Sequence, residues 1–316
     1  MAVMTPLDFA QLYFNLDTYI FTPDEIAKPD YPLAVGWRKL RVAKYRLTES
    51  TWAETFWKEI SKRLPQMVDV RVKTVEGYTE DALLTPEDLE QHFKSPFRGK
   101  GTPEEAQIAI QLVYRYHKTH MPPEVFVQQP GFIGLDCNGF VGTYIQRVVH
   151  KQKWREAKQK AWKWGGAGTY IETLFRGTVK SKGGREMTDL ESMKSEDTYV
   201  LALCDRDNGT ISDPDGHGHY GHVMITEPNS MFPLVSSNMT GALPSLSLLS
   251  VPNRGTGGIF LRVVQASGPV GTGVLHHDYC TLHSPSRKAN GTVFELSKGT
   301  WSGGRGMPVR VARLPV

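Results

Sequence analysis

The chain has 316 residues, of which 40% are hydrophobic and 22% are charged, and its formal net charge at pH 7 is +4. This composition indicates a globular protein with enough apolar side chains for one large core or two smaller ones, and it excludes an intrinsically disordered chain or a collagen-like fibre. The small positive charge favours polyanions only weakly and gives no sign of specific nucleic-acid binding.

No run of apolar residues approaches the length of about 18 that spans a bilayer, so we expect no membrane span. The first residues carry two aspartates and no positively charged segment, so no secretory signal peptide is predicted. We therefore expect a protein that is either cytoplasmic or exported to the cell envelope by a route that needs no such signal; the sequence does not choose between them.

The first hundred residues are predicted to form a mainly helical accessory region. Within it, Thr51–Leu64 has apolar residues spaced four apart, as in an amphipathic helix. The polar stretch Lys94–Gly101, rich in proline, glycine and cations, is predicted to separate residues 1–100 from a second domain over residues 101–316.

The second domain is predicted to begin with two helices. The sequence T-P-E-E at Thr102 has a capping threonine, proline at the first helical position and an acidic first turn, so we expect a helix over Pro103–Tyr116. After a proline-rich loop, Asp136 and Cys137 precede an apolar and basic segment that runs to about Trp164. This pattern places Cys137 at the N-terminus of a second helix.

Strands are predicted to dominate the rest of the chain, because the hydrophobic period changes from helical to alternating. The fold class that follows is α+β, with a helix bearing the cysteine packed on an antiparallel sheet. The predicted strands are Asp197–Cys204, Tyr220–Thr226, Met231–Val235, Gly258–Gln265 and Val309–Leu314.

Cys137 is the candidate nucleophile. A thiolate is the reactive form of cysteine, and the positive end of a helix together with a nearby histidine cation lowers the pKa of a thiol. Unpaired backbone N–H groups in the same turn could also stabilise an oxyanion. The alternative role for Cys137 is that of a small, inert core residue.

The three cysteines are too few and too scattered for a disulfide framework, and none belongs to a C-x-x-C pair, so at least one is expected to be a free thiol. His222 is the candidate base that would activate Cys137, and it shares a strand face with Met224. The alternative is a core histidine bonded to a backbone carbonyl.

Three segments in order resemble the NlpC superfamily of papain-like cysteine peptidases and amidases. They are G-L-D-C-N-G-F-V from Gly134, E-D-T-Y-V-L-A-L from Glu196 and G-H-V-M-I from Gly221. The resemblance spans roughly Thr102–Asn238. It implies a papain-like fold and a thiol hydrolase that needs no cofactor, cleaving amide bonds in the peptide stems of bacterial cell walls.

In that family a third polar residue, often a histidine about twelve residues after the first, orients the imidazole. This register falls on Leu234, which cannot do so. If the preceding turn is longer than usual, Ser236 or Asn238 takes the place, and both share strand parity with His222. The residues do not separate these two candidates.

A rival chemistry is a metal-dependent hydrolase, because His217, His219 and His222 lie close together with two aspartates in a glycine-rich loop. We nevertheless predict no bound metal, since such a loop is more often a solvated turn. A calcium loop is favoured even less, because the glycine after Asp205 comes one place early and the closing glutamate is absent.

The segment 147–163 after the cysteine is strongly basic and could attract an anionic polymer, although a solvated helix face explains it as well. Its cations are Arg147, Lys151, Lys153, Arg155, Lys158, Lys160 and Lys163.

The sequence therefore favours a cysteine peptidase or amidase whose partner is a peptide or peptidoglycan substrate, and it identifies no inhibitor or immunity protein. The alternative of a different class is a non-catalytic peptide- or glycan-binding module, motivated by Leu234 at the position where the family has a histidine.

Overall fold

The computed structural model describes residues 4–21, 36–44, 51–117, 119, 121–156, 175, 185–211, 222–234, 258–267, 273–298 and 306–314. Its backbone contacts divide the chain into two compact units. The helix–sheet unit comprises residues 8–167 and 266–275, and the barrel unit comprises residues 1–7, 168–265 and 276–316. Each unit is described by itself.

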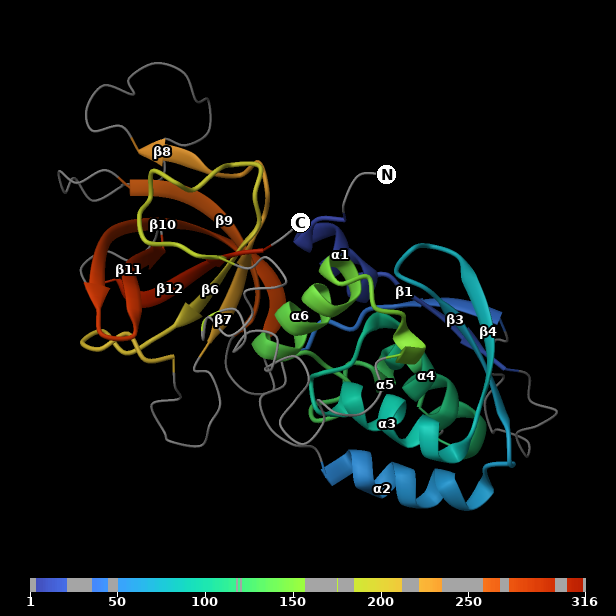
Figure 1. The fold of residues 1–316 in the computed structure, drawn as a ribbon. Coiled ribbons are helices and arrows are strands. Elements are labelled where there is room, and N and C mark those ends of the chain that lie inside the picture. The colour runs from blue at the N-terminus through green and yellow to red at the C-terminus, as the bar shows by residue number, and fades with distance from the viewer. Residues whose placement is uncertain are drawn as a thin grey trace. The chain divides into compact units, whose positions relative to one another are not determined.

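The helix–sheet unit holds all of the longer helices that the structure describes (Figure 1). Its strands are β1 (Leu16–Ile20), β2 (Gly36–Leu40), β3 (Val68–Lys73) and β4 (Thr79–Leu84), and its helices are α1 (Pro6–Phe14), α2 (Thr51–Ile60), α3 (Pro86–Phe97), α4 (Pro103–Leu112), α5 (Pro123–Phe126) and α6 (Cys137–Tyr144).

The four strands form an antiparallel sheet in the order β2-β1-β3-β4, and α4 packs against β1 and β3. In β3 the valines alternate with charged residues, so the valines are buried while Asp69 and Lys73 are exposed. Gln107 and Gln111 of α4 each bond both the N–H and the C=O of one β3 residue, which gives these backbone groups of β3 side-chain partners from the helix.

The region over residues 1–100, predicted to be mainly helical, is mixed, because besides α1, α2 and α3 it supplies all four strands of the sheet. The strands are short, and β4 has little hydrophobic alternation. The strict alternation V-D-V-R-V-K of β3 was nevertheless a readable strand signal.

Two of the predicted helices are confirmed, with small differences at their ends. The segment predicted at Thr51–Leu64 forms α2 and a short 3-10 turn, Ser61–Arg63. The helix at Thr102 starts with a complete capping box between Thr102 and Glu105, and the α-helical part continues as one π-turn, Val113–His117.

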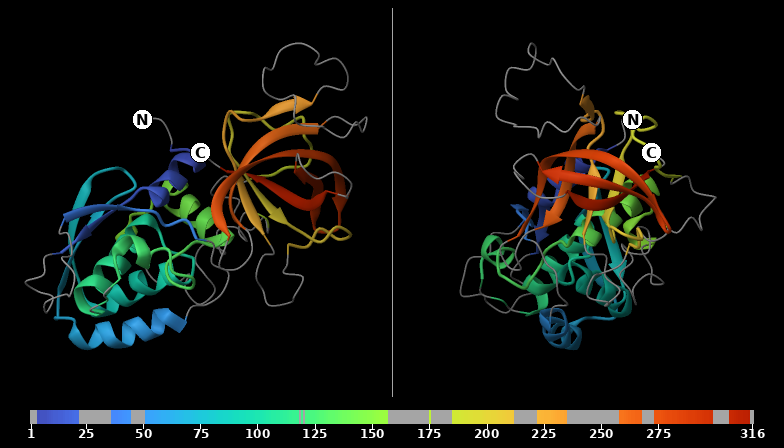
Figure 2. Two further views of the ribbon diagram at one scale, coloured as in Figure 1. Left: turned by 180° about the vertical axis from the view of Figure 1, so that it is seen from behind. Right: turned by 90° about the vertical axis from the view of Figure 1, so that its left-hand side faces the viewer.

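The barrel unit is built from an antiparallel sheet that curls until two of its outer strands pair with each other (Figure 2). Strands β10, β11, β12, β6, β7 and β9 follow one another in hydrogen-bonded order, and β9 also pairs with β10, so six strands form a closed barrel. Their bounds are β6 (Tyr199–Leu203), β7 (Val223–Thr226), β9 (Gly258–Ser267), β10 (Val274–Lys288), β11 (Gly291–Lys298) and β12 (Met307–Arg313); β5 (Arg185–Glu186) and β8 (Phe232–Leu234) pair outside this ring.

Alternate residues of the six strands fill the barrel interior. In each strand every second residue points inward, and these inward residues form a single buried core. It includes Tyr199, Leu201, Met224, Ile259, Leu261, Val263, Cys280, Leu282, Phe294, Leu296, Val309 and Val311. Within this ring each of the six described strands has a hydrogen-bonded neighbour on both sides, while β5 and β8 lie outside it.

The α+β class is confirmed, and the five predicted strands correspond to β6, β7, β8, β9 and β12. The long strands β10 and β11 were not predicted, and they are what closes the barrel. None of the helices in the described ranges combines the length and apolar character that crossing a bilayer requires.

Candidate functional site

Cys137 is the first residue of α6, as predicted, and only 4% of its surface is exposed. Asp136 is the N-cap residue, and its carboxylate accepts the N–H of Gly139. Lys100 lies 2.5 Å from the other oxygen of that carboxylate. The turn that carries the thiol is therefore held by a cap whose charge is balanced by a neighbouring cation.

The backbone of residues 96–101 lies directly against the cysteine turn. The N–H of Asp136 donates to the carbonyl of Gly99 at 3.0 Å, and the N–H of Gly134 donates to the carbonyl of Pro96 at 3.2 Å. The boundary predicted near residue 100 thus lies inside the helix–sheet unit, because this polar stretch supports the cysteine turn.

Gly139 is required by this close approach. A Cβ atom built at Gly139 would lie 1.7 Å from the carbonyl oxygen of Gly99, which is backbone and cannot rotate away. We expect Gly139→Ala to lower the free energy of unfolding by about 3 kcal/mol or more, measured by chemical denaturation, because the two segments must separate. Asn138→Ala in the same turn is the control and should cost less than half as much, since no hydrogen bond of the Asn138 side-chain oxygen is lost.

Helix α1 packs on α6 and fixes its other side. Phe9 contacts the rings of Phe140 and Tyr144, and the hydroxyl of Tyr13 donates to the carbonyl of Gly101 at 2.9 Å. Residues from the predicted accessory region are thus part of the core around the cysteine helix rather than an appendage.

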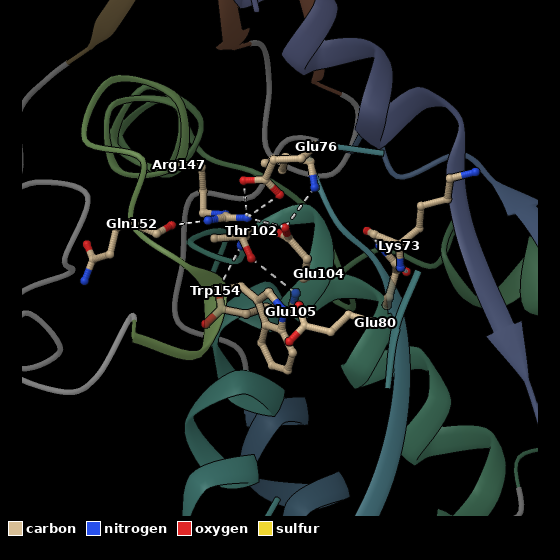
Figure 3. Close-up of polar contacts among 11 residues, drawn as sticks. Lys73, Glu76, Glu80, Thr102, Glu104, Glu105, Arg147, Gln152 and Trp154 are labelled. Carbon is tan, nitrogen blue, oxygen red and sulfur yellow. Dashed lines mark hydrogen bonds and ion pairs between the residues drawn. The ribbon is translucent and has the colours of Figure 1, made fainter. Parts of the chain in front are cut away.

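A buried ion pair anchors the chain that leaves α6 (Figure 3). Arg147 lies in the π-turn Ile145–Val149, and its guanidinium donates to Oε1 of Glu104 at 2.6 Å. The side chains are 1% and 0% exposed. Oε1 of Glu104 also accepts the N–H of Val75 at 3.0 Å, so this carboxylate joins α4, the β3–β4 turn and the π-turn.

The basic segment 147–163 is not one exposed helix in its described part. α6 ends at Tyr144, and a separate 3-10 turn follows at Trp154–Glu156. Arg147 is buried in its ion pair, and Arg155 pairs with Glu80 at 2.5 Å. The prediction of a basic helix over 147–163 is therefore corrected for Arg147, which is buried, whereas Arg155 lies at the surface in an ion pair. Lys158, Lys160 and Lys163 lie outside the described residues.

His222 immediately precedes β7 in the barrel unit and has the strand parity of Met224, whose side chain belongs to the interior core. Gln265 has the parity of the interior residues of β9, and Asp278 that of Cys280 on β10. On each strand these polar side chains therefore lie next to the inward-facing apolar residues and at one end of the barrel. We call His222, Gln265, His276, Asp278 and Lys298 the barrel-mouth cluster.

The cluster is connected by hydrogen bonds. Nε2 of His222 lies 2.5 Å from Oε1 of Gln265, and the amide nitrogen of Gln265 donates to Asp278. The ammonium of Lys298 donates to the same carboxylate oxygen at 2.9 Å, and Nε2 of His276 lies 3.0 Å from it. Mouths of barrels are common places for binding sites.

The pKa of His222 lies below its ordinary value of 6.5. Burial is the main cause, since it disfavours the charged imidazolium, and the positive charges of Lys298 and His276 act in the same direction. The hydrogen bond to Gln265 and the charge of Asp278 act against them. At neutral pH the imidazole is therefore neutral and can accept a proton.

We expect the titration of His222, followed by the NMR shift of its Cε1 proton, to have a midpoint below 6.5. Lys298→Met should move that midpoint to higher pH, because a positive charge that opposes protonation is removed. Arg287→Met, on the neighbouring strand β10, is the control, because it removes a cation that lies outside the cluster. It should leave the titration midpoint of His222 unchanged. A Lys298→Met midpoint below that of the wild type would contradict this electrostatic assignment.

Gln265 is the residue that bonds the imidazole, and sequence reasoning missed it. Ser236 and Asn238, the predicted third residues, lie outside the described residues, and Leu234 is the last residue of β8. The signal was present in the predicted strand Gly258–Gln265, where a glutamine continues the inward row of Ile259, Leu261 and Val263.

Of the three histidines in the alternative metal-binding loop, His217 and His219 lie outside the described residues. Within the described ranges no group of three or more histidine, cysteine, aspartate or glutamate side chains could hold a metal ion. All three cysteines are described, and none forms a disulfide. Burial raises the pKa of Cys204 and Cys280 to about 12, so these two thiols are poor nucleophiles.

Cys137 belongs to the helix–sheet unit, and His222 and Gln265 belong to the barrel unit.

No family model, curated protein or solved structure matches this chain.

Proposed function

We propose that the protein is a cysteine hydrolase of the papain-like NlpC type, in which Cys137 is the nucleophile, His222 the general base and Gln265 the residue that orients the imidazole. The observation that carries the proposal is the bond between Nε2 of His222 and the side-chain oxygen of Gln265. A neutral imidazole whose Nε2 donates this bond has its lone pair on Nδ1, which is then available to take a proton.

In the proposed reaction Sγ of Cys137 attacks an amide carbonyl while its proton passes to Nδ1 of His222. The C–N bond of the tetrahedral intermediate then breaks, and the imidazolium protonates the leaving amine. Water attacks the resulting thioester while His222 takes a proton from that water. The C–S bond of the second tetrahedral intermediate then breaks, the imidazolium returns its proton to Sγ of Cys137, and the carboxylic acid product leaves. The mechanism requires the thiol and the imidazole to act on the same carbonyl.

The local structure around Cys137 is consistent with this role. The thiol lies in the first turn of α6, where backbone N–H groups point along the helix axis toward its N-terminus. The capping bonds of Asp136 and the close contact with Gly99 fix this turn, so its geometry does not have to be organised during the reaction.

The substrate class that we propose is the peptide stem of bacterial peptidoglycan, which rests on the resemblance of the cysteine and histidine segments to the NlpC superfamily. Incubating the protein with purified wall fragments should release a new amine and a new carboxylate from the same bond. The products are identified by their masses.

Alkylation tests the nucleophile in the same assay. We expect iodoacetamide to abolish product release in step with labelling of Cys137, and to leave Cys204 and Cys280 unlabelled at neutral pH because their thiols stay protonated. A chelator should have no effect. Loss of activity on chelation with none on alkylation would favour the metal-dependent alternative, and tight binding of a stem peptide without any product would favour the binding module.

A further inference from the structure

The barrel-mouth cluster contains a carboxylate that the proposed reaction does not use. Asp278 accepts hydrogen bonds from Gln265 and Lys298, and Gln265 in turn bonds the imidazole of His222. It therefore lies one residue beyond the imidazole-orienting glutamine, on the neighbouring strand β10.

Asp278 is a carboxylate that can only accept hydrogen bonds. Burial acts to raise its pKa, but the hydrogen bond and charge of Lys298, together with His276 and Gln265, outweigh burial and hold the pKa below its ordinary value. The group facing Asp278 from Gln265 must consequently be the NH₂ and not the carbonyl.

The orientation of Gln265 decides the tautomer of His222. With its NH₂ on Asp278, the amide presents its carbonyl oxygen to Nε2 of His222. A carbonyl accepts and cannot donate, so Nε2 must carry the hydrogen, and the neutral ring keeps its lone pair on Nδ1. A flipped amide would instead donate to Nε2 and force the hydrogen onto Nδ1.

We infer that Asp278 is a positioning residue that acts through Gln265 to fix which nitrogen of His222 is the base. This role rests on the proposed hydrolase and deepens it, because the glutamine alone does not specify its own orientation. Lys298 supports this role, because its ammonium forms an ion pair with the Asp278 carboxylate and keeps that carboxylate ionised.

The test is the tautomer of His222, read from the ¹⁵N shifts of its imidazole in protein labelled at histidine, with His222→Gln to assign the signals. Wild type should have the hydrogen on Nε2. Asp278→Ala removes the acceptor, and Lys298 is then free to bond the Gln265 carbonyl, so we expect a population with the hydrogen on Nδ1. Asp278→Leu serves the same test if the alanine variant does not fold.

Two matched variants separate this role from a general structural one. Asp278→Asn keeps an acceptor oxygen for Gln265 and Lys298 and should keep the wild-type tautomer. The double variant Asp278→Ala with Gln265→Glu should restore the wild-type tautomer of His222. A carboxylate at position 265 accepts a hydrogen bond from Nε2 with either oxygen, whichever residue stands at position 278. We expect Asp278→Ala to lower kcat by about a hundredfold with KM little changed. Asp278→Asn should retain most of the wild-type kcat.

An unchanged tautomer in folded Asp278→Ala would overturn the inference, whatever happens to turnover. A wild-type protein that releases no product from wall fragments would reject the proposed hydrolase instead. The ¹⁵N spectra would still decide the role of Asp278, because they require no substrate.

Discussion

Replacing Cys137 by alanine is expected to lower the turnover of peptidoglycan fragments by about 10⁴-fold or more, because no other group in the proposed mechanism can form the thioester. The change removes one sulfur atom from a side chain that is 4% exposed. Turnover is measured as amine released per unit time, with substrate in excess, and folding is checked by the melting temperature.

Cys204→Ala is the matched control for Cys137→Ala, since Cys204 is also a buried thiol and burial raises its pKa to about 12. It should keep the wild-type rate. A Cys137→Ala protein with undiminished turnover would end the assignment of the nucleophile, and equal losses in both variants would point to unfolding and not to chemistry.

Replacing Arg147 by methionine is expected to lower the free energy of unfolding by about 3–5 kcal/mol, because it leaves a buried carboxylate without its cation. Glu104 is fully buried, and the guanidinium is its only ion-pair partner among the described residues. The loss is measured by urea denaturation at neutral pH.

The double variant Arg147→Met with Glu104→Gln tests the same interaction from the other side. It removes both charges and keeps an oxygen for the N–H of Val75, so it should be more stable than Arg147→Met alone. Arg155→Met is the surface control. Its pair with Glu80 is partly exposed, so its loss should cost no more than about 1 kcal/mol. A similar, small effect of both arginine substitutions would contradict the assignment of a buried, uncompensated charge.

The helices and their starts were largely readable from the sequence because the signals are local. Thr102 is the helix cap that the T-P-E-E pattern predicts, with Glu105 completing a capping box, and Asp136 caps the helix that begins at Cys137. Such contacts join residues a few positions apart, so spacing and residue type are sufficient to predict them.

The charged residues show the limit of the same reasoning. Arg147 belongs to a run of cations that resembles a solvated surface, yet it is buried because Glu104, far away in the chain, meets it in the core. A composition pattern gives the charge of a segment but not the partner that the fold brings to it.

By itself, the sequence determined the α+β class, the helix that begins at Cys137, the strand face that His222 shares with Met224 and the cap at Thr102, since each depends on periodicity or short spacing. Only the tertiary structure decided that β10 and β11 close a barrel, and that Gln265 of β9 bonds the imidazole of His222. Strand pairing joins residues that are distant along the chain, and its order is set by the packing of a common core, which no local pattern encodes.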